Sequence, residues 1–97
     1  MKLTAKRYEA LKHIDGHILI FDDGPPTQFY VDGADENLHP ATCHWLIRNK
    51  LIAWDREWNE RQELCSMIGF SITNEGQAAL RVNGPKATVL KFRPRAA

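Results

Sequence analysis

The sequence of 97 residues predicts one small domain that mixes α-helices and β-strands. Apolar residues recur at helical spacing near the N-terminus, two short apolar segments flank a turn rich in glycine and proline, and a strand-like segment runs into a threonine suited to start a helix. The apolar share of 43% and the charged share of 26% are ordinary for a globular protein. We therefore expect residues 1–97 to form a single α+β domain.

The first predicted element is a helix at residues 5–14. Thr4 precedes it, and a threonine hydroxyl can accept a hydrogen bond from an amide that the first turn leaves unpaired. Gly16 follows it and suits the left-handed conformation that commonly ends a helix. The apolar face of this helix comprises Ala5, Tyr8, Leu11 and Ile14.

A β-hairpin is predicted next, with strands at 17–22 and 28–31. The sequence Asp-Asp-Gly-Pro-Pro at 22–26 favours a turn between them, because proline cannot donate to a strand ladder. The face expected to point inward carries Ile18, Ile20, Phe29 and Val31. The opposite face carries Leu19, Phe21 and Tyr30. Because both faces are apolar, the hairpin is either covered on both sides or exposes a patch that binds a partner.

The second half of the chain is expected to contain two helices around a two-stranded ribbon. Pro40 fits the first turn of a helix, and Thr73 can cap another helix whose first turn gains from the negative charge of Glu75. In order, the expected elements are a polar loop at 32–38, a helix at 40–51, strands at 52–58 and 65–72 with an exposed tip at 59–63, and a helix that follows Thr73 and stops at 83–85. The chain ends in a basic tail, residues 85–97.

This order of helix, ribbon and capped helix resembles the C-terminal half of a winged helix-turn-helix domain over residues 38–83. The stretch Leu-Ile-Arg-Asn-Lys-Leu-Ile at 46–52 resembles the end of a recognition helix and the start of the wing. The stretch Ile-Thr-Asn-Glu-Gly-Gln-Ala-Ala-Leu at 72–80 is similar to the helix after the wing. The resemblance implies a small winged-helix-like domain with an extra N-terminal β-hairpin, in which the recognition-like helix 40–51 enters the DNA major groove beside a β-wing at 52–72.

The chain departs from the winged-helix pattern just before residue 39. Winged-helix domains place a helix there, which packs behind the recognition helix and helps to set its angle. An acidic hairpin and a polar loop occupy that position here. Either a very short helix lies at 35–38, or the domain is a degenerate winged helix.

Charge is distributed unevenly along the chain. Residues 17–40 contain five acidic residues and no lysine or arginine, whereas residues 81–97 contain five basic residues and no acid. The net charge is only +1 and the isoelectric point is about 7.8, so a surface that binds nucleic acid would have to be local. The acidic segment and the basic tail could equally meet a protein partner.

The resemblance assigns a set of polar and basic residues to a binding surface for DNA or another partner. On the helix these residues are Thr42, His44, Trp45, Arg48, Asn49 and Lys50; in the wing they are Arg56 and Arg61; in the tail they are Lys91 and Arg93. Such side chains contact phosphates and base edges. Acidic neighbours in the wing, Glu57, Glu60 and Glu63, would repel phosphate.

Trp45 allows two interpretations. By helical periodicity it points away from Cys43 and Leu46, and an exposed tryptophan is a good anchor for a protein partner. Alternatively, it packs beneath the wing beside Trp54 or Trp58.

The sequence gives no pattern for catalysis, metal binding or a cofactor. His39 and Cys43 are four residues apart, which allows shared metal ligation on a helix, but the chain lacks the Cys-x-x-Cys pairs of structural zinc sites. Cys43 and His44 are adjacent and so point in different directions from a helix, which prevents a thiol–imidazole couple. We expect no enzyme activity, no metal and no cofactor, and we expect Cys43 and Cys65 to be free, buried thiols.

The same composition favours a cytoplasmic protein. No apolar run reaches the roughly 20 residues that cross a bilayer, and residues 1–7 lack the apolar stretch of a signal peptide. We therefore expect no membrane partner.

Two functions fit these expectations. The first is a small, non-catalytic DNA-binding transcriptional regulator, with a homodimer left open because winged helices often read paired half-sites. The second is a protein-interaction module on the same scaffold, such as a phage or mobile-element inhibitor of a host defence complex, of the kind that blocks CRISPR systems. The acidic surface for such a partner would comprise Asp22, Asp23, Asp32, Asp35 and Glu36.

Overall fold

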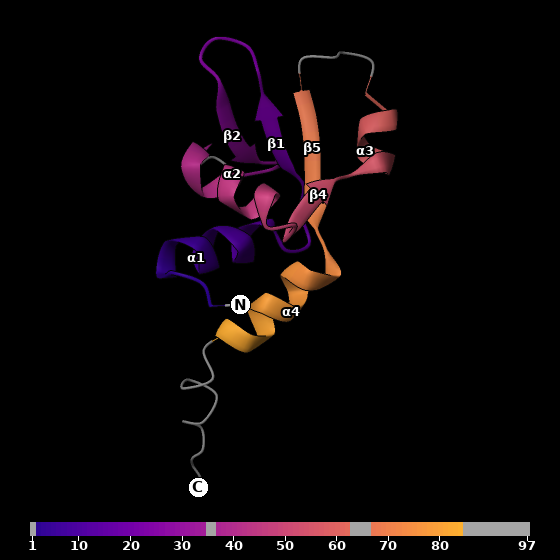
Figure 1. Ribbon diagram of the computed structural model, residues 1–97. Coiled ribbons are helices and arrows are strands. Elements are labelled where there is room, and N and C mark those ends of the chain that lie inside the picture. Colours follow the sequence, from indigo (N-terminus) through magenta and orange to yellow (C-terminus); the bar gives the residue numbers. More distant parts are fainter. Residues whose placement is uncertain (1, 35–36, 63–66, 85–97) are drawn as a thin grey trace, which may run out of the picture.

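The structure is a computed structural model that describes residues 2–34, 37–62 and 67–84. The described part is a mixed α+β domain built on a five-stranded sheet (Figure 1). The elements are α1 (Ala5–Ile14), β1 (Leu19–Asp22), β2 (Gln28–Val31), β3 (Asn37–Leu38), α2 (Pro40–Arg48), β4 (Ile52–Trp54), α3 (Arg56–Glu60), β5 (Met67–Ile72) and α4 (Asn74–Asn83). The strands lie in the order β3-β2-β1-β5-β4, and each neighbouring pair is antiparallel. Among the described helices, none combines the length and the apolar composition that a membrane crossing requires.

Helices α1 and α4 are N-capped by Thr4 and Thr73, the threonines that the sequence predicts. The Thr4 hydroxyl accepts a hydrogen bond from the Arg7 amide at 3.3 Å, and the Thr73 hydroxyl accepts one from the Gly76 amide at 3.0 Å. Gly16 follows α1 in the left-handed region with a φ of 80°. The predicted bounds of α1 and the predicted starts of both helices are confirmed.

The start of α4 is tied to the segment that follows α2. The Thr73 amide donates to the Leu51 carbonyl at 3.0 Å, and the Thr73 hydroxyl donates to the Lys50 carbonyl at 2.7 Å. Gly76 lies so close to the Leu51 carbonyl that a Cβ at this position would overlap it. These contacts fix the end of α2, the start of β4 and the first turn of α4 against one another.

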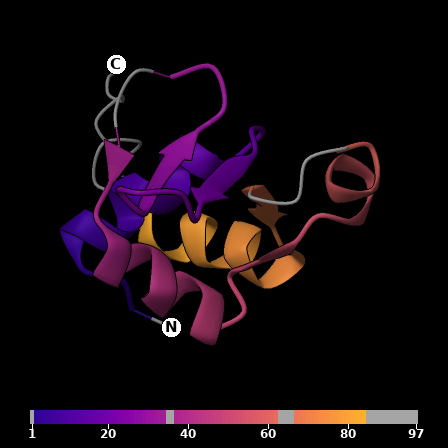
Figure 2. The same ribbon diagram turned by 90° about the horizontal axis from the view of Figure 1, so that it is seen from above.

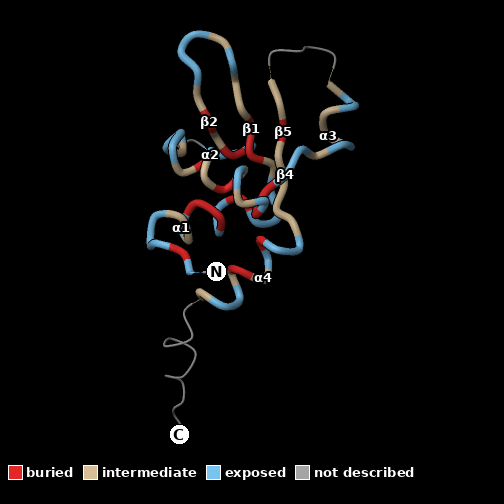
Figure 3. Tube along the Cα trace, viewed as in Figure 1, coloured by how far each residue is buried: buried red, intermediate tan, exposed pale blue. Residues whose placement is uncertain are grey.

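The main core lies between the sheet and helices α1, α2 and α4 (Figures 1 and 3). Its most deeply buried side chains are Leu11, Ile14, Leu19, Phe29, Cys43, Leu46 and Ile52. They come from both halves of the chain, so the N-terminal hairpin and the residues after Pro40 form one hydrophobic unit.

The register of the hairpin corrects its predicted inner face. Leu19 lies opposite Val31, and both side chains belong to the main core. Ile20 lies opposite Tyr30, so these two side chains point to the other face of the sheet. The predicted inner face, Ile18, Ile20, Phe29 and Val31, therefore mixes side chains from both faces. The loop length sets the register, and a shift of one residue exchanges the two faces.

The second face of the sheet is covered where α3 packs on β5. The Trp58 ring lies directly on Gly69, in space that any Cβ at this position would occupy. Ile20 pairs with Gly69 across the sheet and is only 5% exposed although it lies outside the main core. The hairpin is therefore apolar on both faces, and its second face is covered in part: Ile20 is buried, whereas Ile18 and Tyr30 are half-buried.

The predicted polar loop at 32–38 ends earlier than expected. Asn37 and Leu38 form β3 and pair with β2, and the Asn37 side chain donates to the Gln28 carboxamide oxygen at 3.0 Å. The hypothesis of a short helix at 35–38 is wrong for these two residues, because they are extended; Asp35 and Glu36 lie outside the described residues.

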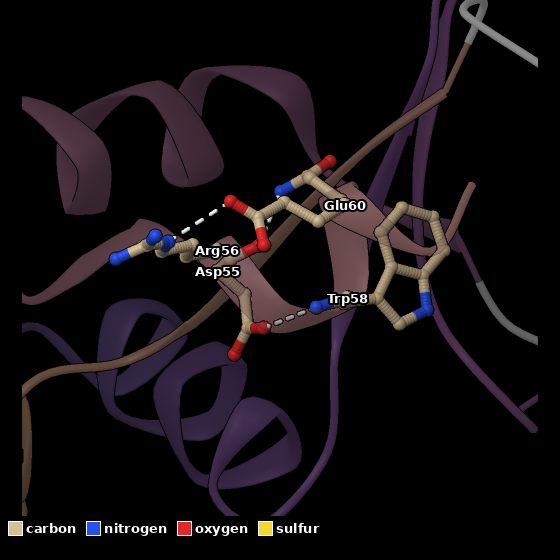
Figure 4. A network of polar contacts seen from close by, with 5 residues as sticks. Asp55, Arg56, Trp58 and Glu60 are labelled. Atoms are coloured by element: carbon tan, nitrogen blue, oxygen red, sulfur yellow. Dashed lines mark hydrogen bonds and ion pairs between the residues drawn. The ribbon is translucent and has the colours of Figure 1, made fainter. Parts of the chain in front are cut away.

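The predicted strand at 52–58 stops at Trp54, because the chain turns into helix α3. The Asp55 carboxylate caps α3 by accepting the Trp58 amide at 2.8 Å (Figure 4). The Asn59 side chain accepts the Gly69 amide at 2.9 Å and donates to the Gly69 carbonyl at 2.8 Å. The Gly69 carbonyl also accepts the Asp55 amide at 2.9 Å, so the Asn59 side chain replaces only the backbone acceptor of the Gly69 amide, and β4 pairs with β5 over three residues. The predicted tip at 59–63 is thus partly helical, and the predicted second strand begins at Met67 among the described residues.

We predict that Asn59→Ala lowers the free energy of unfolding by about 1–3 kcal/mol, because it leaves the partly buried Gly69 amide without an acceptor and removes one of the two donors to the Gly69 carbonyl, the other being the Asp55 amide. Urea unfolding followed by tryptophan fluorescence measures the change. Arg56→Ala is the matched control, since it removes only an exposed ion pair from the same helix and should have little effect. A loss for Asn59→Ala no larger than for Arg56→Ala would contradict this assignment.

Candidate functional site

Helix α2 covers the sheet with one side and presents the other to solvent (Figure 2). Cys43 and Leu46 are fully buried, whereas Ala41, His44 and Arg48 are exposed on the outward side. The helix ends at Arg48 rather than at residue 51 as predicted, because Lys50 adopts a φ of 61° that a continuing helix does not allow.

Trp45 packs against α1, an arrangement that neither interpretation of the sequence anticipated. Its ring is half-buried, and the guanidinium carbon of Arg7 lies 3.9 Å from the ring centroid. Arg7 comes from the first turn of α1, so this contact joins the two helices. Sequence reasoning missed Arg7, since nothing in the pattern of α1 distinguishes it from Lys6.

The other predicted residues of the α2 surface divide by their local contacts. His44 is exposed but meets the Phe29 ring edge-on, with 5.3 Å between the ring centroids. The Asn49 side chain donates to the Trp45 carbonyl at 2.8 Å and so helps to end the helix. Arg48 and Lys50 are exposed at the same end of α2. The helix surface therefore offers cations at its C-terminal end and an imidazole near its middle.

A groove of about 390 Å³ lies between α1, β3 and the start of α2. Its polar lining comprises Lys6, Glu9, His13, Asn37, His39 and Thr42. Helices α1 and α2 both begin on the left in Figures 1 and 2. Neither helix has an acidic residue in its first turn. The His39 Nδ1 atom accepts the Ala41 amide at 3.2 Å and caps α2. Thr42, which is half-buried, is the member of the predicted binding set that lines this groove.

The predicted wing arginines both have an acidic neighbour, Glu60 of α3 for Arg56 and the capping residue Asp55 for Arg61. Arg56 forms an ion pair with Glu60, with 2.9 Å between Nε and Oε2 (Figure 4). The pKa of Asp55 is lowered because its carboxylate accepts the Trp58 amide and the Ser71 hydroxyl, and Arg61 adds a smaller attraction. Local carboxylates thus offset the positive charge of this segment.

The described members of the alternative acidic surface, Asp22, Asp23 and Asp32, do not come together as one patch. Asp22 and Asp23 lie at the hairpin loop, where the Asp22 carboxylate accepts the Gly24 amide at 3.0 Å. Asp32 lies at the opposite end of β2, where its amide donates to the Ile18 carbonyl. The remaining members of the predicted sets, Asp35, Glu36, Lys91 and Arg93, lie outside the described residues.

The residues considered for metal binding have separate roles. Within the described ranges, no group of three or more histidine, cysteine, aspartate and glutamate side chains is arranged to hold a metal ion. His39 caps α2 at the surface, whereas Cys43 is fully buried. Burial raises the pKa of the Cys43 thiol to about 12, so it stays protonated and unreactive at neutral pH. Cys65 lies outside the described residues.

Comparisons of the chain with models of known protein families, with curated proteins and with solved structures find no match. The assignment of a function therefore depends on the arrangement of this chain's own residues.

We predict that Cys43 resists thiol reagents in the folded protein. In a Cys65→Ser background, Ellman's reagent should modify Cys43 only after denaturant unfolds the domain, because the thiol is buried and protonated. Absorbance at neutral pH measures the rate. Fast labelling without denaturant would contradict the burial of α2 against the sheet.

Proposed function

We propose that this protein is a non-catalytic DNA-binding module that places α2 in the major groove, as a small transcriptional regulator would. The observation that carries the proposal is the charge of the α2 region: residues 37–54 contain no aspartate or glutamate. The exposed side of α2 presents Ala41, His44 and Arg48, with Lys50 just beyond it. A helix with a small residue, polar side chains and cations on its outward side suits contact with base edges and phosphates.

The strands beside α2 support a winged-helix-like arrangement. β4 follows α2 directly and pairs antiparallel with β5, which leads into the Thr73-capped helix α4. The segment between these strands carries α3, so the proposed wing is partly helical. β2 and β3 occupy the sequence position of the helix that winged-helix domains place before the recognition helix, and Phe29 of β2 packs against His44.

The charges of the described residues predict weak DNA binding that depends strongly on α2. The described residues carry as many acidic as basic side chains, and α3 offers no cation without an acidic neighbour. Few phosphates would be neutralised, so affinity should be highest at low salt and should fall with a shallow salt slope.

We predict that Arg48→Ala weakens binding to duplex DNA by about 1–3 kcal/mol, because it removes a cation from the outward side of α2. Fluorescence anisotropy with a labelled mixed-sequence duplex at about 50 mM salt measures the affinity. Arg56→Ala is the matched control and should bind like the wild type, since Glu60 already pairs with Arg56. No binding by the wild-type chain at this salt concentration would overturn the proposal, and equal binding by Arg48→Ala would exclude α2 as the interface.

A protein-interaction module is the second candidate, and one observation favours it. Trp54 on the edge strand β4 is 55% exposed, and a large exposed aromatic side chain is a common anchor at protein interfaces. On this reading the chain would bind a protein complex, for instance as a phage-borne inhibitor of a host defence system.

We predict for this second candidate that Trp54→Ala abolishes capture of a specific partner from a cell lysate, whereas Arg48→Ala leaves capture unchanged. Affinity capture followed by mass spectrometry identifies the bound proteins. Recovery of the same proteins by the wild type and by Trp54→Ala would contradict a role for this surface.

A further inference from the structure

We infer that Arg7 of α1 is a second phosphate-contacting residue and that Trp45 is the positioning residue that presents it. This inference rests on the proposed function and deepens it, because it adds a helix outside residues 38–83 to the DNA interface. It also replaces the earlier interpretations of Trp45 as a partner anchor or as a side chain beneath the wing.

The geometry of the pair is the first observation. The guanidinium carbon of Arg7 lies 3.9 Å from the centroid of the Trp45 ring, and both side chains are half-buried. This contact restricts the long arginine side chain before any ligand arrives, so less conformational entropy remains to be lost on binding. A guanidinium that lies over an aromatic ring can still donate hydrogen bonds from its N–H groups.

The second observation is that the described residues offer these N–H groups no acceptor. Within residues 2–34, 37–62 and 67–84, the Arg7 guanidinium forms no hydrogen bond or ion pair. Arg56 provides the contrast, because Glu60 satisfies its charge at 2.9 Å. Arg7 is thus a restrained, half-buried cation with donors available, which suits bidentate contact with a phosphate.

The third observation is where the pair lies. Trp45 and Arg48 are three residues apart on α2 and are neighbours on the helix surface. The Arg7–Trp45 pair therefore lies beside the outward side of α2 that carries Arg48. Arg7 also belongs to the first turn of α1, which has no acidic residue and whose partial positive charge favours an anion. A helix seated in a groove has phosphates along both of its sides, and Arg7 is placed to meet one of them.

The test measures the salt dependence of DNA binding, because each phosphate contact contributes about one to the slope of log affinity against log salt. Fluorescence anisotropy with a mixed-sequence duplex is recorded from about 50 to 200 mM salt for Arg7→Ala, Trp45→Leu, Trp45→Phe and the double variant. Lys12→Ala, an exposed cation on the same helix, is the matched control. Urea unfolding of each variant separates folding from binding.

We predict that Arg7→Ala lowers the magnitude of the slope of log affinity against log salt by about one. Over this fourfold change in salt, the factor by which the affinity of Arg7→Ala falls should therefore be about 3.5 times smaller than the factor for the wild type. Trp45→Leu should show part of this loss although Arg7 is intact, and Trp45→Phe should retain most of the wild-type slope because an aromatic face remains. The double variant should bind no more weakly than Arg7→Ala alone, because Trp45 acts through Arg7. Lys12→Ala should bind like the wild type.

The outcomes separate this inference from the proposed function. If Arg48→Ala weakens binding while Arg7→Ala keeps the full salt slope, α2 binds DNA and the inference about Arg7 is wrong. If the wild-type chain binds no DNA at low salt, the proposed function fails and the inference fails with it. If Arg7→Ala does not fold, Arg7→Lys is measured instead; it keeps the charge but lacks the planar, bidentate donor set, so full wild-type affinity for this variant would also overturn the inference.

Discussion

The arrangement of this domain depends on the contact between the Leu51 carbonyl and the start of α4. The Thr73 amide and hydroxyl bond to the Leu51 and Lys50 carbonyls, and Gly76 allows the helix backbone to approach the same carbonyl. This junction brings together the end of α2, the first residue of β4 and the last residue of β5, where Ile52 pairs with Ile72. The outward side of α2 is therefore oriented both by these bonds to the sheet junction and by the packing of α2 on α1.

Elements with local signals could be predicted from the sequence, and elements that depend on distant partners could not. α1, the strands of the hairpin and the start of α4 follow from caps, glycine and turn residues that lie within or next to each element. Residues 56–58 of α3 were predicted as strand and residues 59–60 as part of an exposed tip. The Asp55 cap is a local signal that the prediction missed, whereas the bonds between Asn59 and Gly69 join residues ten apart and could not be read from the sequence. The faces of β1 were exchanged because the register depends on the loop, which periodicity within one strand does not report.

The candidate site shows the same division. Helical periodicity indicated Arg48 and His44 as outward residues of α2, and the structure places both at the surface. The same pattern could not reveal that Asn49 ends the helix or that a carboxylate satisfies Arg56, because both depend on which acceptor lies within reach. Arg7 was missed altogether, since its relevance comes from Trp45 on another helix.

The side-chain amide of Asn59 also affects how the sheet meets other molecules. An exposed strand edge is a template on which the strand of another chain can grow. Here the edge of β5 beyond β4 is occupied at Gly69 by the Asn59 carboxamide, and the outer strands β3 and β4 span only two and three residues. In the described sheet, the edge along which another chain could extend the ladder is therefore short and interrupted at Gly69, and Asn59 contributes to this interruption as well as to the attachment of α3.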